Sequence, residues 1–179
     1  FTVNPGEITV VLGRSGCGKS TILKTLIGLI PPISGRVLFF GEPVDYRSET
    51  SLDSLYQRIG VLYQNGALLN SFTLFENVAL PMKMHFPHMP REIEREMVLS
   101  RLEQVGLSHA VHRYPSELSG GMRKRAALAR AMILDPDIIF CDEPSAGLDP
   151  ITAAGLDHLM KELKELLGIT FVVVTHELR

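Results

Sequence analysis

The sequence predicts an α/β fold with a mostly parallel sheet, and three features of the chain support this. Short β-branched apolar runs alternate with longer segments in which apolar residues recur every three or four positions. The first run, residues 8–12, leads into a glycine-rich loop and then into a helical pattern. A later run, residues 138–141, ends in two adjacent acidic residues. Alternation of this kind is typical of parallel strands joined by crossover helices.

Each expected element follows from its own pattern and its own terminators. We expect strands at residues 8–12, 36–40, 59–63, 138–141 and 171–175. One helix follows the first strand, with Ile22, Leu23, Leu26, Ile27 and Ile30 on one face and with Pro31-Pro32 at its end. A second helix covers residues 121–134 and stops at Asp135-Pro136. The last has its apolar face between Leu156 and Leu167 and closes at Gly168.

Residues 65–115 differ from the rest because strand patterns are absent there. A helix is expected at residues 91–105, with Glu92 and Glu94 in its first turn and Gly106 beyond its end. We interpret residues 65–115 as a helical subdomain inserted into one catalytic core made of residues 1–64 and 116–179.

The glycine-rich loop matches the pattern G-x-x-x-x-G-K-[ST] and lies between a strand and a helix, the context that gives this pattern its meaning. Its glycines let successive backbone N–H groups face a polyphosphate, and the helix directs the positive end of its dipole at the same charge. Lys19 is expected to reach the β- and γ-phosphates and Ser20 to bind Mg²⁺. The predicted nucleotide contacts are Gly13, Arg14, Ser15, Gly16, Cys17, Gly18, Lys19, Ser20 and Thr21.

The acidic pair Asp142-Glu143 follows a buried strand, and ligands of open α/β sheets gather at the carboxyl ends of strands. Taken alone, such a pair is equally consistent with a functional site and with a solvated acidic turn. Next to a phosphate-binding loop, we expect Asp142 to hold Mg²⁺ and Glu143 to polarise the attacking water. These motifs predict a P-loop NTPase (RecA-like) core.

Segment 118–122, Leu-Ser-Gly-Gly-Met, places a hydroxyl and two glycine N–H groups at the start of a predicted helix. It resembles the signature of ABC ATPases, which usually has Gln in place of Met122. Gln64 matches the family's Q-loop, segment 145–149 resembles its D-loop, and His176 matches its switch histidine. The resemblance spans nearly the whole chain and implies an inserted ABC-type helical subdomain.

The resemblance also implies roles for residues outside the phosphate loop. Gln64, Glu143 and His176 would be catalytic, and Ser20, Gln64 and Asp142 would bind Mg²⁺. Two copies would pair head to tail around two ATP molecules. Each copy would then contact its partner's nucleotide through Ser119, Gly120, Gly121 and Asp149.

Partners and location follow from the same resemblance. An integral membrane permease subunit would dock near residues 64–81, on the cytoplasmic face of the inner membrane, so the chain would be a peripheral subunit. The apolar residues Leu68, Leu69, Phe72, Leu74, Phe75 and Leu80 exceed what a surface loop needs. We expect half of them to form the core of the insertion and one or two to receive the partner.

Three segments resemble bacterial phospholipid-trafficking ATPases that maintain outer-membrane lipid asymmetry with MCE-domain proteins. They are residues 64–69, 75–81 and 115–122, and Met122 is the most characteristic position. An MCE-type substrate-binding protein is therefore an expected partner. The family's adenine-stacking aromatic residue should precede Phe1, and relatives continue beyond Arg179, so we expect the chain to be a domain cropped at both ends.

Composition excludes several other classes. The chain has 179 residues, 45% hydrophobic, with a net charge of −2, which gives no indication of nucleic-acid binding. Cys17 and Cys141 form no metal or disulfide pattern and are expected to be small buried residues. Segment 123–125, Arg-Lys-Arg, is expected to be a solvated helix face.

Three alternative functions stay open. A soluble ABC ATPase of the DNA-repair or chromosome-structure type would need a longer insertion than the one between Gln64 and Ser119. A module that binds ATP without hydrolysing it is disfavoured by Glu143 and His176. The same ATPase could also serve another cargo, such as amino acids or a metal chelate.

Overall fold

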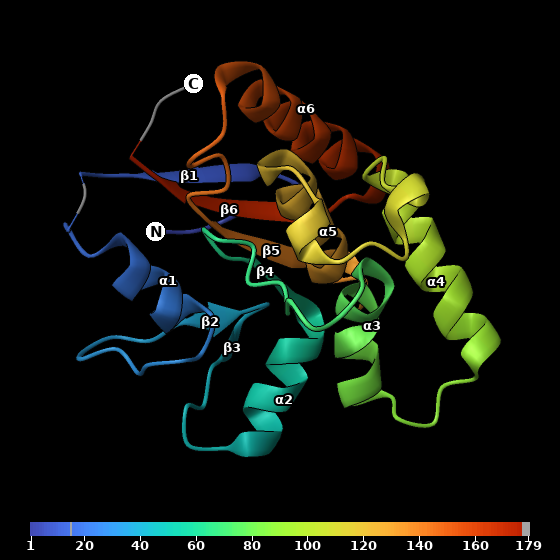
Figure 1. The fold of residues 1–179 in the computed structure, drawn as a ribbon. Helices are drawn as coiled ribbons and strands as arrows, with labels where there is room; N and C mark the ends of the chain where they lie inside the picture. Colours follow the sequence, from blue (N-terminus) through green and yellow to red (C-terminus); the bar gives the residue numbers. More distant parts are fainter. Residues whose placement is uncertain (15, 177–179) are drawn as a thin grey trace.

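The computed structural model describes residues 1–14 and 16–176, and its centre is a four-stranded parallel sheet (Figure 1). The strands are β1 (Ile8–Leu12), β4 (Ile59–Leu62), β5 (Ile138–Asp142) and β6 (Thr170–Thr175), in the spatial order β1-β6-β5-β4. Every neighbouring pair is parallel. The predicted α/β fold is confirmed, and these four predicted strands are correct to within one residue at either end.

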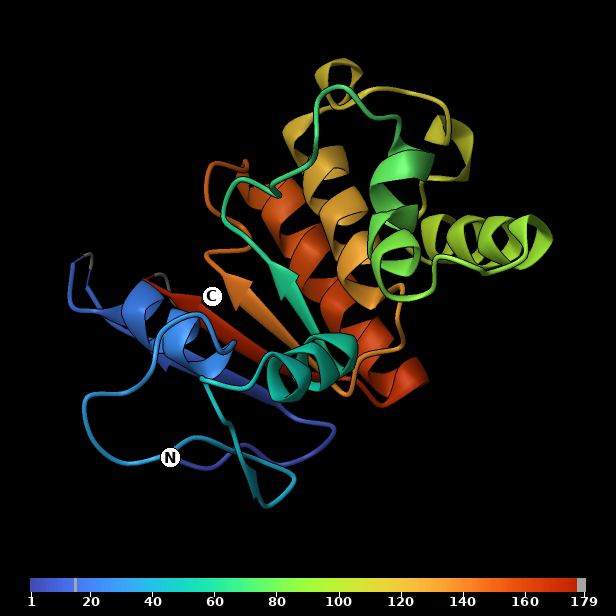
Figure 2. The same cartoon turned by 90° about the horizontal axis from the view of Figure 1, so that it is seen from below.

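Helices cover both faces of the sheet (Figure 2). One face carries α1 (Lys19–Leu26) and α2 (Glu49–Arg58), and the other carries α5 (Gly120–Met132) and α6 (Pro150–Leu167). The alternation along β5 explains the two layers, because Ile138 and Phe140 pack with α1 and α2 whereas Ile139 and Cys141 pack with the opposite helices. A strand that is apolar on both faces is typical of such a sandwich.

Two elements predicted in the first half of the chain differ in the structure, and α2 is a helix that the sequence did not predict. The strand expected at residues 36–40 is only β2 (Leu38–Phe39), which pairs with β3 (Glu42–Pro43) as an antiparallel hairpin. Positive φ angles at Phe40 and Gly41 reverse the chain there. Helix α1 ends at Leu26, before the expected Pro31, because Gly28 takes a φ of 82°.

The segment 65–115 contains no strand in the described structure, as the sequence predicted. It holds α3 (Leu74–His85), α4 (Arg91–Gln104) and the short helix η1 (Ser108–Ala110), and a second short helix, η2 (Pro115–Glu117), begins at its last residue. The insertion's buried side chains, such as Val78 and Leu102, join the core formed with α5. Its domain boundaries stay a prediction.

Two details of α3 explain its place in the fold. A capping box between Thr73 and Glu76 starts the helix. The buried Asn77 amide then accepts from Leu69 N and donates to Leu69 O, Phe72 O and Thr73 O, which fixes the loop before the helix. Over the described residues, every helix is too short or too polar to cross a bilayer.

Candidate functional site

The carboxyl ends of all four strands meet at one edge of the sheet. In the register, Leu12 lies opposite Thr175, and Asp142 lies opposite Val174. Backbone bonds continue this alignment past the strands, with Gly13 N donating to Thr175 O at 3.2 Å and Glu143 N to Val174 O at 2.8 Å. The phosphate-loop candidates and the acidic pair therefore lie side by side, as the sequence predicted.

The loop before α1 is shaped by glycines. Gly16 and Gly18 have φ angles of 79° and 98°, which other residues rarely adopt, and a Cβ added at Gly13 would lie 2.6 Å from Cys17 Sγ. Helix α1 begins after Gly18 without a side-chain cap and without an acidic residue in its first turn. Its first N–H groups thus face the loop, which fits an anion. Ser15, another predicted contact, lies outside the described residues.

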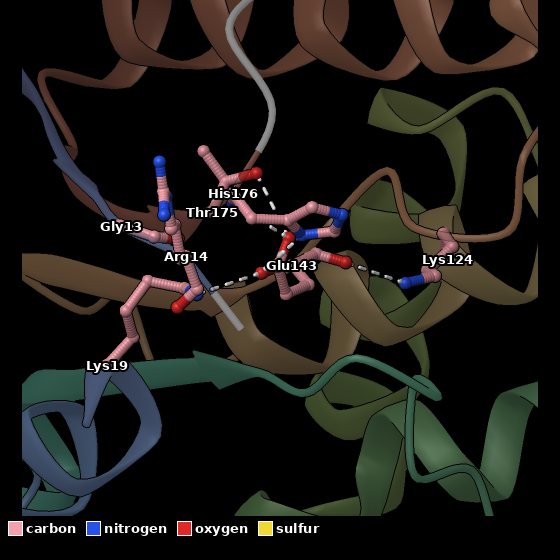
Figure 3. A network of polar contacts seen from close by, with 7 residues as sticks. All are labelled: Gly13, Arg14, Lys19, Lys124, Glu143, Thr175 and His176. Carbon is pink, nitrogen blue, oxygen red and sulfur yellow. Dashed lines mark hydrogen bonds and ion pairs between the residues drawn. The ribbon is translucent and has the colours of Figure 1, made fainter. Parts of the chain in front are cut away.

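Lys19 folds back over this loop and is 8% exposed. Its ammonium donates to Gly13 O at 2.7 Å and to Arg14 O at 3.0 Å. The ammonium also lies 3.7 Å from Glu143 Oε1 (Figure 3). The lysine of the loop and the predicted catalytic carboxylate are therefore neighbours.

The Glu143 carboxylate is held by the end of β6. Its Oε2 accepts from Thr175 Oγ1 at 3.0 Å and from His176 N at 3.3 Å, and His176 Nδ1 lies 2.8 Å from its Oε1. Burial raises the pKa of the Glu143 carboxyl, but the bonds from His176 and Thr175 outweigh this, and its pKa lies below the usual value. The group is therefore ionised at neutral pH and oriented by its neighbours.

The candidate Mg²⁺ ligands are all oxygen donors. Ser20 is exposed in the first turn of α1, Asp142 is half-buried at the end of β5, and Gln64 is exposed just after β4. A hydroxyl, a carboxylate and an amide carbonyl suit a hard cation that keeps waters and also binds phosphate oxygens. No cluster of three His, Cys, Asp or Glu side chains suited to a transition metal occurs in the described part of the chain. The donor set fits Mg²⁺.

A second group of predicted contacts surrounds the start of α5. Ser119 is its N-cap and accepts from Met122 N at 3.2 Å. A Cβ at Gly121 would overlap Thr152 Cγ2, so this glycine lets α5 approach α6 closely. Asp149 caps α6 by accepting from Ile151 N at 3.1 Å and Thr152 N at 3.0 Å. Across the residues that the structure describes, no hydrogen bond or ion pair joins this group to Lys19 and its loop.

A family model described as "ABC transporter" matches residues 1–146. The chain belongs to the ABC transporter family. This confirms the resemblance found in the motifs.

Other members of the ABC transporter family give closer comparisons. The intermembrane phospholipid transport system ATP-binding protein MlaF of Haemophilus influenzae is 46% identical over 175 residues, which are 98% of this chain and 66% of that protein. The probable ribonucleotide transport ATP-binding protein mkl of Mycobacterium tuberculosis is 44% identical over 99% of this chain and 49% of its own length. The chain thus spans two thirds or less of the length of these relatives.

Among solved structures of ABC cassettes, a dimeric post-hydrolysis state of MJ0796 bound to ADP and Pi matches with a TM-score of 0.87. That chain is 33% identical, and the match covers 99% of this chain and 78% of MJ0796. The P-loop NTPase fold predicted from the sequence is thereby confirmed.

The six apolar residues expected near the docking region divide between core and surface. Leu74 is buried, and Leu68, Phe72, Phe75 and Leu80 are half-buried. Leu69 is 41% exposed and lines a cleft with Tyr63, Leu80 and Met84. An apolar side chain left in a cleft suits a protein contact.

Two sequence predictions at the site are wrong. Cys17 is exposed in the loop before α1, although its sulfur lies against Gly13, whereas Cys141 is buried as expected. Lys124 is only 6% exposed and is no part of a solvated face, because α5 packs against β4 and the acidic loop on that side. The run of three basic residues concealed this difference.

Proposed function

We propose that this chain is the ATP-binding and ATP-hydrolysing domain of an ABC transporter. The observation that supports it best is the meeting of Lys19, Glu143 and His176 at an uncapped helix N-terminus. A cation aimed into a glycine loop and an ionised carboxylate with a histidine partner are what phosphoryl transfer to water requires.

Each residue takes a role that its position allows. The glycine loop and Lys19 bind the phosphates, and Thr21, in the same first turn of α1 as Lys19, is a further contact. Glu143 orients the attacking water and accepts its proton, while His176 and Thr175 hold the carboxylate in place. Ser20, Asp142 and Gln64 would hold Mg²⁺, which would supply positive charge to neutralise the phosphate oxygens.

The second group of contacts serves a nucleotide held by another copy of the chain. In the described part of the chain, no hydrogen bond or ion pair joins Ser119 or the adjacent glycines to their own chain's phosphate loop. Head-to-tail pairing would bring Ser119, Gly120, Gly121 and Asp149 to the partner's γ-phosphate. The dimeric state of MJ0796 supports this arrangement.

A membrane partner completes the proposal. The cleft around Leu69, within residues 64–81, is the docking region for an integral membrane permease. The chain then works as a peripheral subunit on the cytoplasmic face of the inner membrane, with an MCE-type substrate-binding protein as a further partner. A nucleotide-driven dimer would transmit closure and opening to this permease.

The proposed cargo is phospholipid, supported by the likeness to MlaF and by Met122 in the signature. A ribonucleotide cargo is the second candidate, because mkl is nearly as similar. Mass spectrometry of small molecules that copurify with the full-length protein and its native membrane partner separates the two. Bound phospholipid supports the first cargo, and bound nucleotide in the membrane partner supports the second.

The ATPase itself is tested by Glu143→Gln in the full-length protein. Loss of the carboxylate should lower turnover by about 10²- to 10⁴-fold, the usual contribution of a general base. ATP binding should persist and a dimer should accumulate, measured by ATP hydrolysis and by size-exclusion chromatography with light scattering. The exposed Glu162→Gln on α6 is the control. A fully active, monomeric Glu143→Gln variant contradicts the assignment.

A further inference from the structure

Lys124 is a buried lysine in the first half of the signature helix α5. Its ammonium donates to the main-chain oxygen of Gln64 and, at 3.3 Å, to that of Glu143. Figure 3 shows it on the side of Glu143 opposite Lys19. One side chain thus joins the loop after β4 to the loop after β5.

The burial of Lys124 makes its two hydrogen bonds important. Loss of solvent lowers the pKa of Lys124, and the neighbouring Asp142 and Glu143 oppose that shift. A lysine at this depth loses its hydration and recovers hydrogen bonds from the two carbonyls. An apolar residue of similar length could fill the same space without that cost.

The backbone held by Lys124 is itself unusual. Glu143 has a φ of 47°, in the left-handed region that side chains other than glycine rarely adopt. The carboxylate of Glu143 is fixed from one side by His176 and Thr175, and its carbonyl is fixed from the other side by Lys124. The surrounding contacts therefore determine where the carboxylate points.

The same helix also holds the rest of the segment after β4. Arg130 donates to Gly66 O and to Ala67 O, both at 2.7 Å. Gly66 and Ala67 have φ angles of 71° and 49°. Helix α5 thus holds three carbonyls of residues 64–67 and one of the acidic loop, while its N-cap is Ser119.

We propose that Lys124 is a positioning residue for ATP hydrolysis. It fixes Glu143 relative to Gln64 and connects both to the helix that begins at Ser119. This inference rests on the proposed function. Contact of Ser119 with the partner chain's nucleotide would then affect the position of Glu143 in the same chain. The start of α5 and the Lys124 ammonium would transmit this effect.

The test is Lys124→Met in the full-length protein, compared with Lys124→Arg. Lys124→Met should lower kcat by about 10- to 100-fold, because displacement of a catalytic group by about 1 Å costs a rate of that order. The dissociation constant of ATP, measured by titration with a fluorescent analogue, should change less than about threefold, since the phosphate loop is intact. Lys124→Arg keeps the donors and should recover much of kcat.

Two controls separate positioning from loss of fold. Val98→Ala in α4 removes buried methyl groups away from the site and should lower the melting temperature with kcat per folded molecule unchanged. Lys161→Met on α6 removes an exposed lysine and should change neither. If Lys124→Met does not fold, Lys124→Gln takes its place with the same expectation.

The outcomes are distinct from those of the proposed function. A wild-type protein without ATPase activity overturns the proposed function itself. An active wild type with unchanged kcat in a folded Lys124→Met variant overturns only the role of Lys124. So does a loss of ATP affinity equal to the loss of turnover, or a folded Lys124→Arg variant as slow as Lys124→Met.

Discussion

Helices α1 and α6 begin in opposite ways, although both lie among the predicted nucleotide contacts. Helix α6 starts at Asp149, whose carboxylate accepts from Ile151 N and Thr152 N. Helix α1 starts at Gly18 with no side-chain cap. A capped N-terminus has its own acceptor, whereas an uncapped one leaves its donors for a ligand. The difference supports the prediction that, within one chain, the nucleotide phosphates bind at α1 and not at α6.

Helix α5 lies between these extremes. Ser119 caps it with one bond to Met122 N, and Gly121 is pressed against Thr152 of α6. The signature glycine therefore has a packing role within the chain as well as the predicted contact with a partner's nucleotide. Substitutions at the three helix starts should therefore affect different properties: ligand binding at α1, packing at α5 and helix capping at α6.

At the start of α1, Lys19→Ala should have the largest effect, and on ligand binding. Hydrogen bonds to charged groups contribute about 1.5–3 kcal/mol, so ATP affinity should fall about 10- to 100-fold. Isothermal titration calorimetry measures it. Lys24→Ala, an exposed lysine on the same helix, should leave affinity unchanged. Equal losses of ATP affinity in both variants would contradict the assignment of phosphate binding to Lys19 at the start of α1.

At the start of α5, Gly121→Ala should act on stability. The added Cβ overlaps Thr152 Cγ2, and overpacking of this kind costs about 1–3 kcal/mol. Urea denaturation followed by circular dichroism measures the loss. Thr152→Ser removes the offending methyl group, so the double variant should recover most of the stability. Absence of that recovery would show that the close approach of the helices is not the cause.

At the start of α6, Asp149→Ala should have the smallest effect of the three variants, a modest fall in melting temperature from the loss of the helix cap. Hydrogen bonds from Thr152 hold the pKa of Asp149 below its usual value. Because the folded pKa is depressed, the stabilisation is present above the unfolded pKa of about 4 and is lost as pH falls through the lower folded value. The melting difference between wild type and variant should thus shrink in acid. A difference that does not change with pH contradicts the carboxylate cap.

The sequence predicted the elements with continuous apolar runs and missed those without them. Strand β5 is apolar on both faces and was readable, whereas α2 is polar and buries only Leu55. Helix α3 contains Pro81, which usually ends a helical pattern. Both helices have local start signals, an N-cap at Ser48 and the capping box at Thr73, but their interiors lack a clear apolar pattern.

The same limit applies to the site. The glycine loop, Asp142, Glu143 and His176 were recognisable because local motifs carry them. Lys124 was not, because its partners Gln64 and Glu143 are distant in sequence and its neighbours Arg123 and Arg125 suggest a solvated face. Only the packing of α5 against the sheet distinguishes Lys124 from them.

We propose that each ATP is held jointly by Lys19 of one chain and Ser119 of another. Mixing two inactive full-length variants, Lys19→Ala and Ser119→Arg, tests it most directly through ATP hydrolysis. Mixed dimers contain one site with both intact parts, so activity should reappear and rise with the fraction of mixed pairs. Full activity of Ser119→Arg alone, or folded variants that pair without any recovered hydrolysis, would contradict the claim.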